Sequence, residues 1–100
     1  MTTSLPASPR LAARLIALEA GLHSVEPSPS HRLVIHEGPP VYAVSVCDGV
    51  ETSRHLQCDG DMDFIPAGAA GSWYDEGPST VLALTLCPSA VDEAARRLGR

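Results

Sequence analysis

The sequence predicts an all-β domain, a sheet of antiparallel strands folded over as a sandwich or barrel, with one helix near each end. From residue 31 to residue 87, short runs rich in Val, Ile, Leu and Thr alternate with turn-forming Gly, Pro and Asp, which is the pattern of consecutive antiparallel strands. The chain has 100 residues, which suits one domain with a modest core. A flat sheet of so many strands would leave long unpaired edges and one face exposed to solvent. We therefore expect the sheet to close on itself.

Residues 1–30 are predicted to form an N-terminal arm and a helix. The helix is expected over 9–22, with Ser8 as its cap and Pro9 at its first position, where a missing N–H costs nothing. Gly21 is suited to end this helix, because glycine readily adopts the left-handed conformation of helix C-caps. Four leucines recur at helical spacing and form one apolar stripe, namely Leu11, Leu15, Leu18 and Leu22.

Residues 31–100 are predicted to form the β domain and a short C-terminal helix. Asp48-Gly49 is a strong hairpin signal, and the strand before it, 41–47, is apolar or small on both alternating faces. We therefore expect that strand in the middle of a sheet, covered on both sides, with the N-terminal helix as a candidate cover. The six strands are expected at about 31–37, 41–47, 51–58, 61–65, 71–75 and 79–87.

The C-terminal helix is predicted to begin at Ser89, which forms a start resembling a capping box with Asp92. Its apolar stripe consists of Val91, Ala94, Ala95 and Leu98. Because so short a helix is marginal alone, we expect it to pack on another surface or to lead into a continuation of the chain.

Composition and charge exclude several classes of function. The net charge is −5 and the seven Arg residues are scattered, whereas binding to a polyanion needs a concentrated cationic face. We therefore expect no direct contact between this chain and nucleic acid. The three cysteines form no CxxC pair, which favours a cytoplasmic location. Arg10 and Arg14 interrupt the first apolar stretch, and no run reaches the roughly 18 apolar residues of a membrane span, so we expect neither a signal peptide nor membrane association.

The usual catalytic and metal-binding patterns are missing from the sequence. It contains no GxSxG elbow, P-loop or GxGxxG motif. His31 and His36 are an odd number of residues apart on one predicted strand, so they point to opposite faces. Cys47, Cys58 and Cys87 lie at predicted strand ends, where a thiol behaves as a small hydrophobe. We predict no catalytic residue, no metal ligand and no cofactor, and a chain that is not an enzyme.

The most informative stretch is 60–73, GDMDFIPAGAAGSW. Gly60 and Asp61 make a tight turn before a short strand, and Pro66-x-Gly68 makes the turn after it. Asp61 is expected to accept hydrogen bonds from nearby backbone N–H groups. This stretch resembles the second motif of the cupin superfamily, G-x5-P-x-G-x2-H. Together with the segment that follows, it resembles more closely the cupin-type amino-terminal domain of AraC-family transcription regulators. The resemblance extends over about residues 31–98 and implies a cupin-like jelly roll or barrel.

The departures from the cupin motifs concern the metal ligands. Gly71 occupies the position of the metal-binding His in the second motif, and no HxH pair occurs upstream. His55 follows Gly49 at the spacing of the first motif, but it lies on the strand that leads into the second one, so we treat this match as coincidence. The resemblance therefore implies a cupin without metal.

The vacated metal position suggests a ligand pocket beside Trp73, the only tryptophan. Trp73 lies two residues beyond Gly71, on the same strand face, and the resemblance directs this face to the barrel interior. A gap beside an indole makes an apolar pocket. The alternative is that Trp73 fills the core of a small barrel, and the core interpretation weighs more for Tyr42, Met62 and Phe64. The candidate ligand-binding residues are Trp73, Tyr42, Phe64, Met62 and His55.

Three functions remain open at this point. The first is the sensory or dimerisation domain of an AraC-like regulator, which binds a small-molecule effector and reaches DNA only through helix-turn-helix units that this chain lacks. The second is a small cupin enzyme, an isomerase or oxygenase, and the third is a plain interaction module. We expect a homodimer that forms through a sheet edge or through the stripes at 11–22 and 91–98. The alternative is that both helices only cover the barrel.

Overall fold

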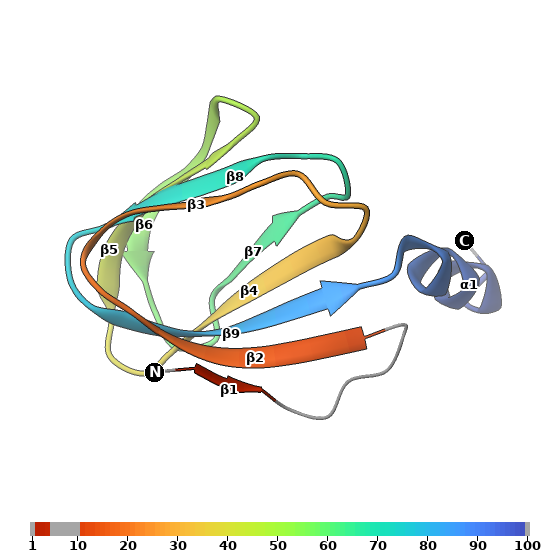
Figure 1. The fold of residues 1–100 in the computed structure, drawn as a ribbon, viewed down its shortest axis with the longest axis horizontal. Helices are drawn as coiled ribbons and strands as arrows, with labels where there is room; N and C mark the ends of the chain where they lie inside the picture. The colour runs from red at the N-terminus through yellow and green to blue at the C-terminus, as the bar shows by residue number, and fades with distance from the viewer. Residues whose placement is uncertain (1, 5–10, 100) are drawn as a thin grey trace.

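A computed structural model describes residues 2–4 and 11–99, and it contains two antiparallel sheets and one helix (Figure 1). The sheets face each other around a shared interior, as in a jelly roll, which confirms the predicted all-β class. The first sheet has the order β1 (Thr2–Ser4), β2 (Leu11–Leu18), β9 (Ser79–Leu86), β4 (His31–Glu37) and β7 (Met62–Ile65). The second has the order β3 (Gly21–Val25), β8 (Gly71–Asp75), β5 (Val41–Cys47) and β6 (Val50–Gln57).

The six predicted strands are confirmed, each within one residue of its expected bounds. The hairpin between β5 and β6 turns at Asp48 and Gly49, whose φ values are 49° and 79°. Positive φ at both central residues is the geometry of a type I′ turn, which matches the twist of the flanking strands. The turn before β7 is also as expected, because Asp61 Oδ2 accepts a hydrogen bond from the N–H of Cys58 at 2.7 Å.

The predicted N-terminal helix is wrong. Residues 11–25 form the strands β2 and β3, while Ser8 and Pro9 lie outside the described residues. The chain turns at Gly21, whose φ of 122° supplies a bend between two strands instead of a helix cap. β2 pairs with β9 along its whole length, from Leu11 opposite Leu86 to Leu18 opposite Ser79. Leucine spacing fits a helix, but both faces of this strand are also apolar, and sheet pairing overrides the local preference.

The C-terminal helix α1 (Pro88–Arg97) is confirmed, but its predicted cap and packing are not. Cys87 is the N-cap residue, no side chain in the described part of the structure makes a capping hydrogen bond, and Pro88 begins the helix one residue before Ser89. None of its residues is buried, and the helix lies beyond the end of the barrel (Figure 1). No helix among the described residues is long and apolar enough to span a membrane.

The prediction for β5 holds in part. It lies between β8 and β6 inside its sheet, as expected for a central strand. Val41, Ala43 and Ser45 are buried on its inner face, whereas the alternate residues are partly exposed. The expected helical cover is wrong, because the segment proposed as that cover is itself part of both sheets.

The interior is not filled by large side chains. Its buried apolar residues are few and mostly small or medium in size, namely Val41, Ala43, Ile65, Ala69 and Val81. Four polar or charged residues are buried with them, namely His36, Ser45, Gln57 and Asp75. No large side chain among the described residues is below 2% exposed. Such an interior leaves room between the two sheets, and this room contains the candidate site.

Candidate functional site

Two cavities large enough for a small molecule lie between the sheets, and Trp73 on β8 forms part of the wall of both. Val34 on β4 and Ile65 on β7 also line both cavities. The first has a volume of about 400 Å³ and contains Asp63, and we call it the acidic cavity. The second has a volume of about 510 Å³ and is lined by two arginines, and we call it the basic cavity. Both volumes lie within the range of small-molecule sites.

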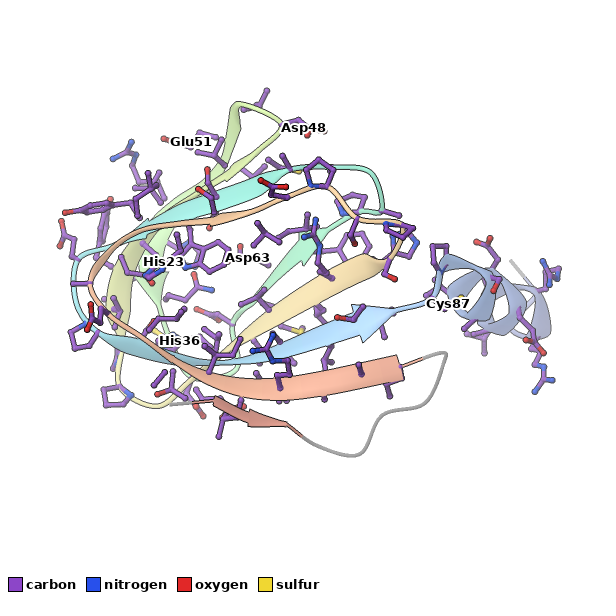
Figure 2. All side chains as sticks on the ribbon, viewed as in Figure 1. His23, His36, Asp48, Glu51, Asp63 and Cys87 are labelled. Atoms are coloured by element: carbon purple, nitrogen blue, oxygen red, sulfur yellow. The ribbon has the colours of Figure 1, made fainter. Side chains whose placement is uncertain are left out.

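The acidic cavity is organised around the carboxylate of Asp63. This carboxylate accepts a hydrogen bond from the Ser45 hydroxyl at 3.2 Å and one from Gln57 Nε2 at 3.4 Å. The three residues come from β7, β5 and β6, so the bonds join the two sheets across the interior, where Figure 2 shows Asp63. Asp63 was not predicted as part of an interior cluster. Met62 and Phe64 were the candidates on this strand, and alternation places Asp63 on the opposite strand face.

The basic cavity is lined by Arg14 from β2 and Arg32 from β4. Two amino groups of Arg32 donate hydrogen bonds to the backbone oxygens of Glu26 at 2.6 Å and Ala69 at 2.9 Å. These bonds hold the side chain against the loops at one end of the barrel. No Asp or Glu lines this cavity among the described residues, so its charged groups are cationic.

A histidine and a carboxyl group meet beside Trp73. His23 Nε2 donates a hydrogen bond to the backbone oxygen of Glu19 at 2.7 Å and lies 4.0 Å from Asp75 Oδ2. Its ring centroid lies 5.7 Å from that of Trp73. Burial raises the pKa of Asp75, although the hydrogen bond that its carboxyl group accepts from Ser79 acts in the opposite direction. The folded chain therefore favours the protonated form of this carboxyl group more than an exposed aspartate would.

The predicted ligand-binding residues fall into two groups, and their proposed contacts with a ligand stay predictions. Trp73 lies inside, between the two cavities, as expected from its place two residues after Gly71. His55 is on the inner face at the rim of the acidic cavity, where its side chain is 47% exposed and lies 3.7 Å from Asp61 Oδ2.

The expectation that Tyr42, Met62 and Phe64 point into the interior is corrected by the strand register. Met62 and Phe64 share a face, as predicted, but Asp63 and Ile65 occupy the inner one. Met62 and Phe64 lie along the outer edge of the acidic cavity and are 61% and 53% exposed. Tyr42 alternates with the buried Val41 and Ala43, and so faces outward. Sequence alternation groups residues by face, but it does not say which face is inside.

The residues present do not fit a metal ion. In the part of the chain that the structure describes, no three His, Cys, Asp or Glu side chains gather as a metal site requires. His36 is buried inside, whereas His31 packs against Phe64 on the outer face, with ring centroids 5.4 Å apart. A Cβ atom added at Gly71 would lie only 2.6 Å from Ile65 Cδ1. The position of the motif histidine is therefore occupied by Ile65 and is not an empty slot.

No family model and no curated protein matches the chain, but solved structures do. A cupin superfamily protein from Desulfitobacterium hafniense DCB-2 aligns with a TM-score of 0.65 at 20% identity, over 86% of this chain and 75% of that one. The cupin domain of Schizosaccharomyces pombe Cnp3 aligns with a TM-score of 0.69 at 10% identity, over 94% and 69%. The fold is that of the cupins. At these identities the likeness concerns the fold alone.

The cupin neighbours correct the prediction that the chain is not an enzyme. They include the DMSP lyase DddQ from Ruegeria pomeroyi DSS-3, with a TM-score of 0.66 at 18% identity over 86% of this chain and 46% of that one. A fold shared with a lyase is compatible with catalysis, so missing sequence motifs did not justify excluding it.

Proposed function

We propose that this cupin-fold chain binds a small organic molecule between its two sheets and acts as the sensory domain of an AraC-like regulator. One observation supports the binding site above all. Three buried side-chain atoms have no hydrogen-bond partner in the described structure, and all three belong to inward-facing residues, namely Arg32 Nε, Ser53 Oγ and Gln57 Oε1.

Buried polar groups without partners are uncommon and costly in folded proteins, typically about 1–3 kcal/mol each. Arg32 lines the basic cavity and Ser53 lines the acidic cavity. Gln57 donates to Asp63 through its Nε2, so its free oxygen lies beside the same cluster. A polar molecule inside the barrel would supply the missing partners, and the apolar walls would bury its carbon skeleton.

The regulator assignment is supported by the resemblance of residues 60–73 to AraC-family cupin domains and by the cupin fold. In that role the barrel receives the effector, and helix-turn-helix units carried elsewhere contact DNA. The gene beyond the codon for Arg100 tests this assignment. Two encoded helix-turn-helix units would support it, and a different domain there would contradict it.

Tryptophan fluorescence and thermal unfolding, measured across a library of small metabolites, test the binding proposal. Because Trp73 is the only tryptophan and borders both cavities, a bound molecule should change its emission and raise the melting temperature. Val34→Phe adds volume at the shared wall of the cavities and should abolish both effects. Val44→Phe, on the partly exposed outer face of β5, is the matched control.

The binding proposal fails if no compound changes the emission, or if Val34→Phe binds as well as the wild type while circular dichroism shows both chains folded. Equal loss in Val44→Phe would also contradict it, because that site lies outside the barrel.

Catalysis is a second candidate, favoured by the pair of Asp75 and His23. A carboxyl group with a raised pKa near a histidine is an arrangement used in general acid–base catalysis. Nuclear magnetic resonance of metabolite mixtures incubated with the protein would detect turnover. Turnover that disappears in Asp75→Asn would support this candidate, and stable mixtures throughout would contradict it.

A further inference from the structure

We propose that the basic cavity selects an organic anion, an apolar molecule that carries one carboxylate; this inference rests on the proposed binding function. Its charged lining consists of Arg14 and Arg32, and none of the described residues around it is acidic. Most of the remaining wall is apolar, including Ile16, Val81 and Trp73. A cationic lining in a chain with a net charge of −5 is a local feature, not a consequence of overall composition.

Arg32 has hydrogen-bonding capacity left for a ligand. Its hydrogen bonds go to the backbone carbonyls of Glu26 and Ala69, which accept hydrogen bonds but do not neutralise a positive charge. Its Nε is buried and has no hydrogen-bond partner among the described residues. A carboxylate oxygen would satisfy this N–H and balance the charge in a site of low polarity, where such bonds are strong.

Arg14 lies on the same inner face as Arg32. It pairs with Ala83 of β9, and Ala83 pairs with Val34 of β4, two residues along the strand from Arg32. Arg14 itself is exposed, so it lies where the cavity opens to solvent. A carboxylate arriving from solvent would therefore meet Arg14 first.

The acidic cavity on the other side of Trp73 favours one orientation. Asp63 there carries a carboxylate that would repel a second anion. The carboxylate of the ligand is therefore expected among the arginines, with its carbon chain along Trp73 and the apolar wall.

The test compares octanoate, 1-octanol and octylamine, which share a carbon chain but differ in charge. Octanoate should change Trp73 emission and bind at least about tenfold more tightly than 1-octanol, and octylamine should bind least. Arg14→Gln should weaken octanoate binding at least about tenfold and leave 1-octanol binding unchanged. Arg54→Gln is the control, because Arg54 pairs with Glu51 on the exposed face of β6.

The outcomes separate the two proposals. Equal binding of octanoate and 1-octanol, unaffected by Arg14→Gln, would overturn the anion inference and leave barrel binding intact. If no compound in this set or in the metabolite library changes Trp73 emission, both proposals fail.

A separate observation concerns the outer face of the five-stranded sheet. The register aligns apolar side chains in two continuous rows across β2, β9, β4 and β7. One row contains Leu15, Leu82, Ile35 and Met62, and the other contains Ala13, Leu84, Leu33 and Phe64. We infer that this face binds a second copy of the chain.

The outer face is more apolar than a solvated sheet face, which normally carries polar residues. Leu15, Met62 and Phe64 are 39%, 61% and 53% exposed. With roughly 200 Å² per large side chain, these three residues and the adjoining Leu11, which is 46% exposed, expose about 400 Å², and the half-buried members of the rows add to this area. These four residues alone supply about half of the roughly 800 Å² that each partner buries in a stable interface. The rows carry no charged residue, so a copy of the same face related by a two-fold axis is complementary to them.

Sedimentation equilibrium of the wild type and two variants tests whether the outer face binds a second copy of the chain. The wild type should sediment at twice the chain mass of 10.5 kDa, and the double variant Met62→Glu/Phe64→Glu should sediment as a monomer. Leu56→Glu is the matched control, because Leu56 is 52% exposed on the other sheet, and it should remain a dimer. A monomeric wild type at about 100 µM, within the micromolar range of weak interfaces, would overturn the inference. So would a dimeric double variant.

Discussion

At the scale of single residues, Gly71 and Ile65 explain how the interior differs from a metal-binding cupin. Ile65 is only 5% exposed, and its Cδ1 lies 2.6 Å from the place where a Cβ at residue 71 would be. Gly71→Ala should therefore lower the free energy of unfolding by about 1–3 kcal/mol. Ile65→Val removes the clashing methyl group, so the double variant should lose less stability than the sum of the single variants. Urea denaturation measures the free energy of unfolding of all three variants. If the losses in the two single variants add up to the loss in the double variant, the two side chains do not compete for the same space.

The stability of the chain should depend on pH through Asp75. Because its pKa is raised in the folded state, the folded chain binds this proton more tightly than the unfolded chain does. The stabilising contribution is complete below the unfolded value near 3.8 and is lost as pH rises through the raised pKa. Between about pH 4 and about pH 7, the wild type should lose more stability than Asp75→Asn. If stability fell equally with pH in the two chains, the raised pKa of Asp75 would be contradicted.

The site residues show which information the sequence carries about side chains. The inward position of Trp73 could be predicted from the sequence. Trp73 lies two residues after Gly71, so the two share a strand face, and the resemblance to the cupin motif directs that face to the interior. Ser45, Asp63 and Gln57 meet only because three strands from two sheets converge, and no spacing along the chain records this convergence. The hydrogen bond from Arg32 to the backbone oxygen of Ala69 likewise joins residues that lie 37 positions apart in the sequence.

At the scale of elements, turn residues were a more reliable guide than hydrophobic periodicity. The Gly, Pro and Asp clusters located six strands, because turns of defined geometry require those residues. The spacing of Leu11, Leu15, Leu18 and Leu22 fits a helix as well as a strand with two apolar faces. Only the pairing of β2 with β9 and of β3 with β8 decides between them.

The helix α1 should contribute little to the stability of the barrel. It has no buried residue, and so short a helix gains little stability without packing. Removal of residues 88–100 should change the free energy of unfolding by no more than about 0.5 kcal/mol. Thermal and urea unfolding of the shortened chain measure this change. A loss above about 2 kcal/mol would show that the helix supports the barrel.

At the scale of the whole molecule, two sheets enclose an interior whose polar groups are only partly satisfied. The closed architecture followed from the sequence, because many short strands must hide their edges and one face. The acidic and basic cavities that share Trp73 could not be predicted from the sequence, because they depend on which strand faces point inward.

Two-dimensional ¹H–¹⁵N nuclear magnetic resonance, with octanoate and neutral metabolites as probes, tests the interior binding site most directly. The single indole N–H of Trp73 gives one signal that reports on both cavities. We predict that a binding compound shifts this signal together with backbone signals of Arg32, Val34 and Ile65, while Leu56 and the residues of α1 stay unchanged. Shifts confined to outward-facing residues, or none at the Trp73 indole for any compound, would contradict a ligand site inside the barrel.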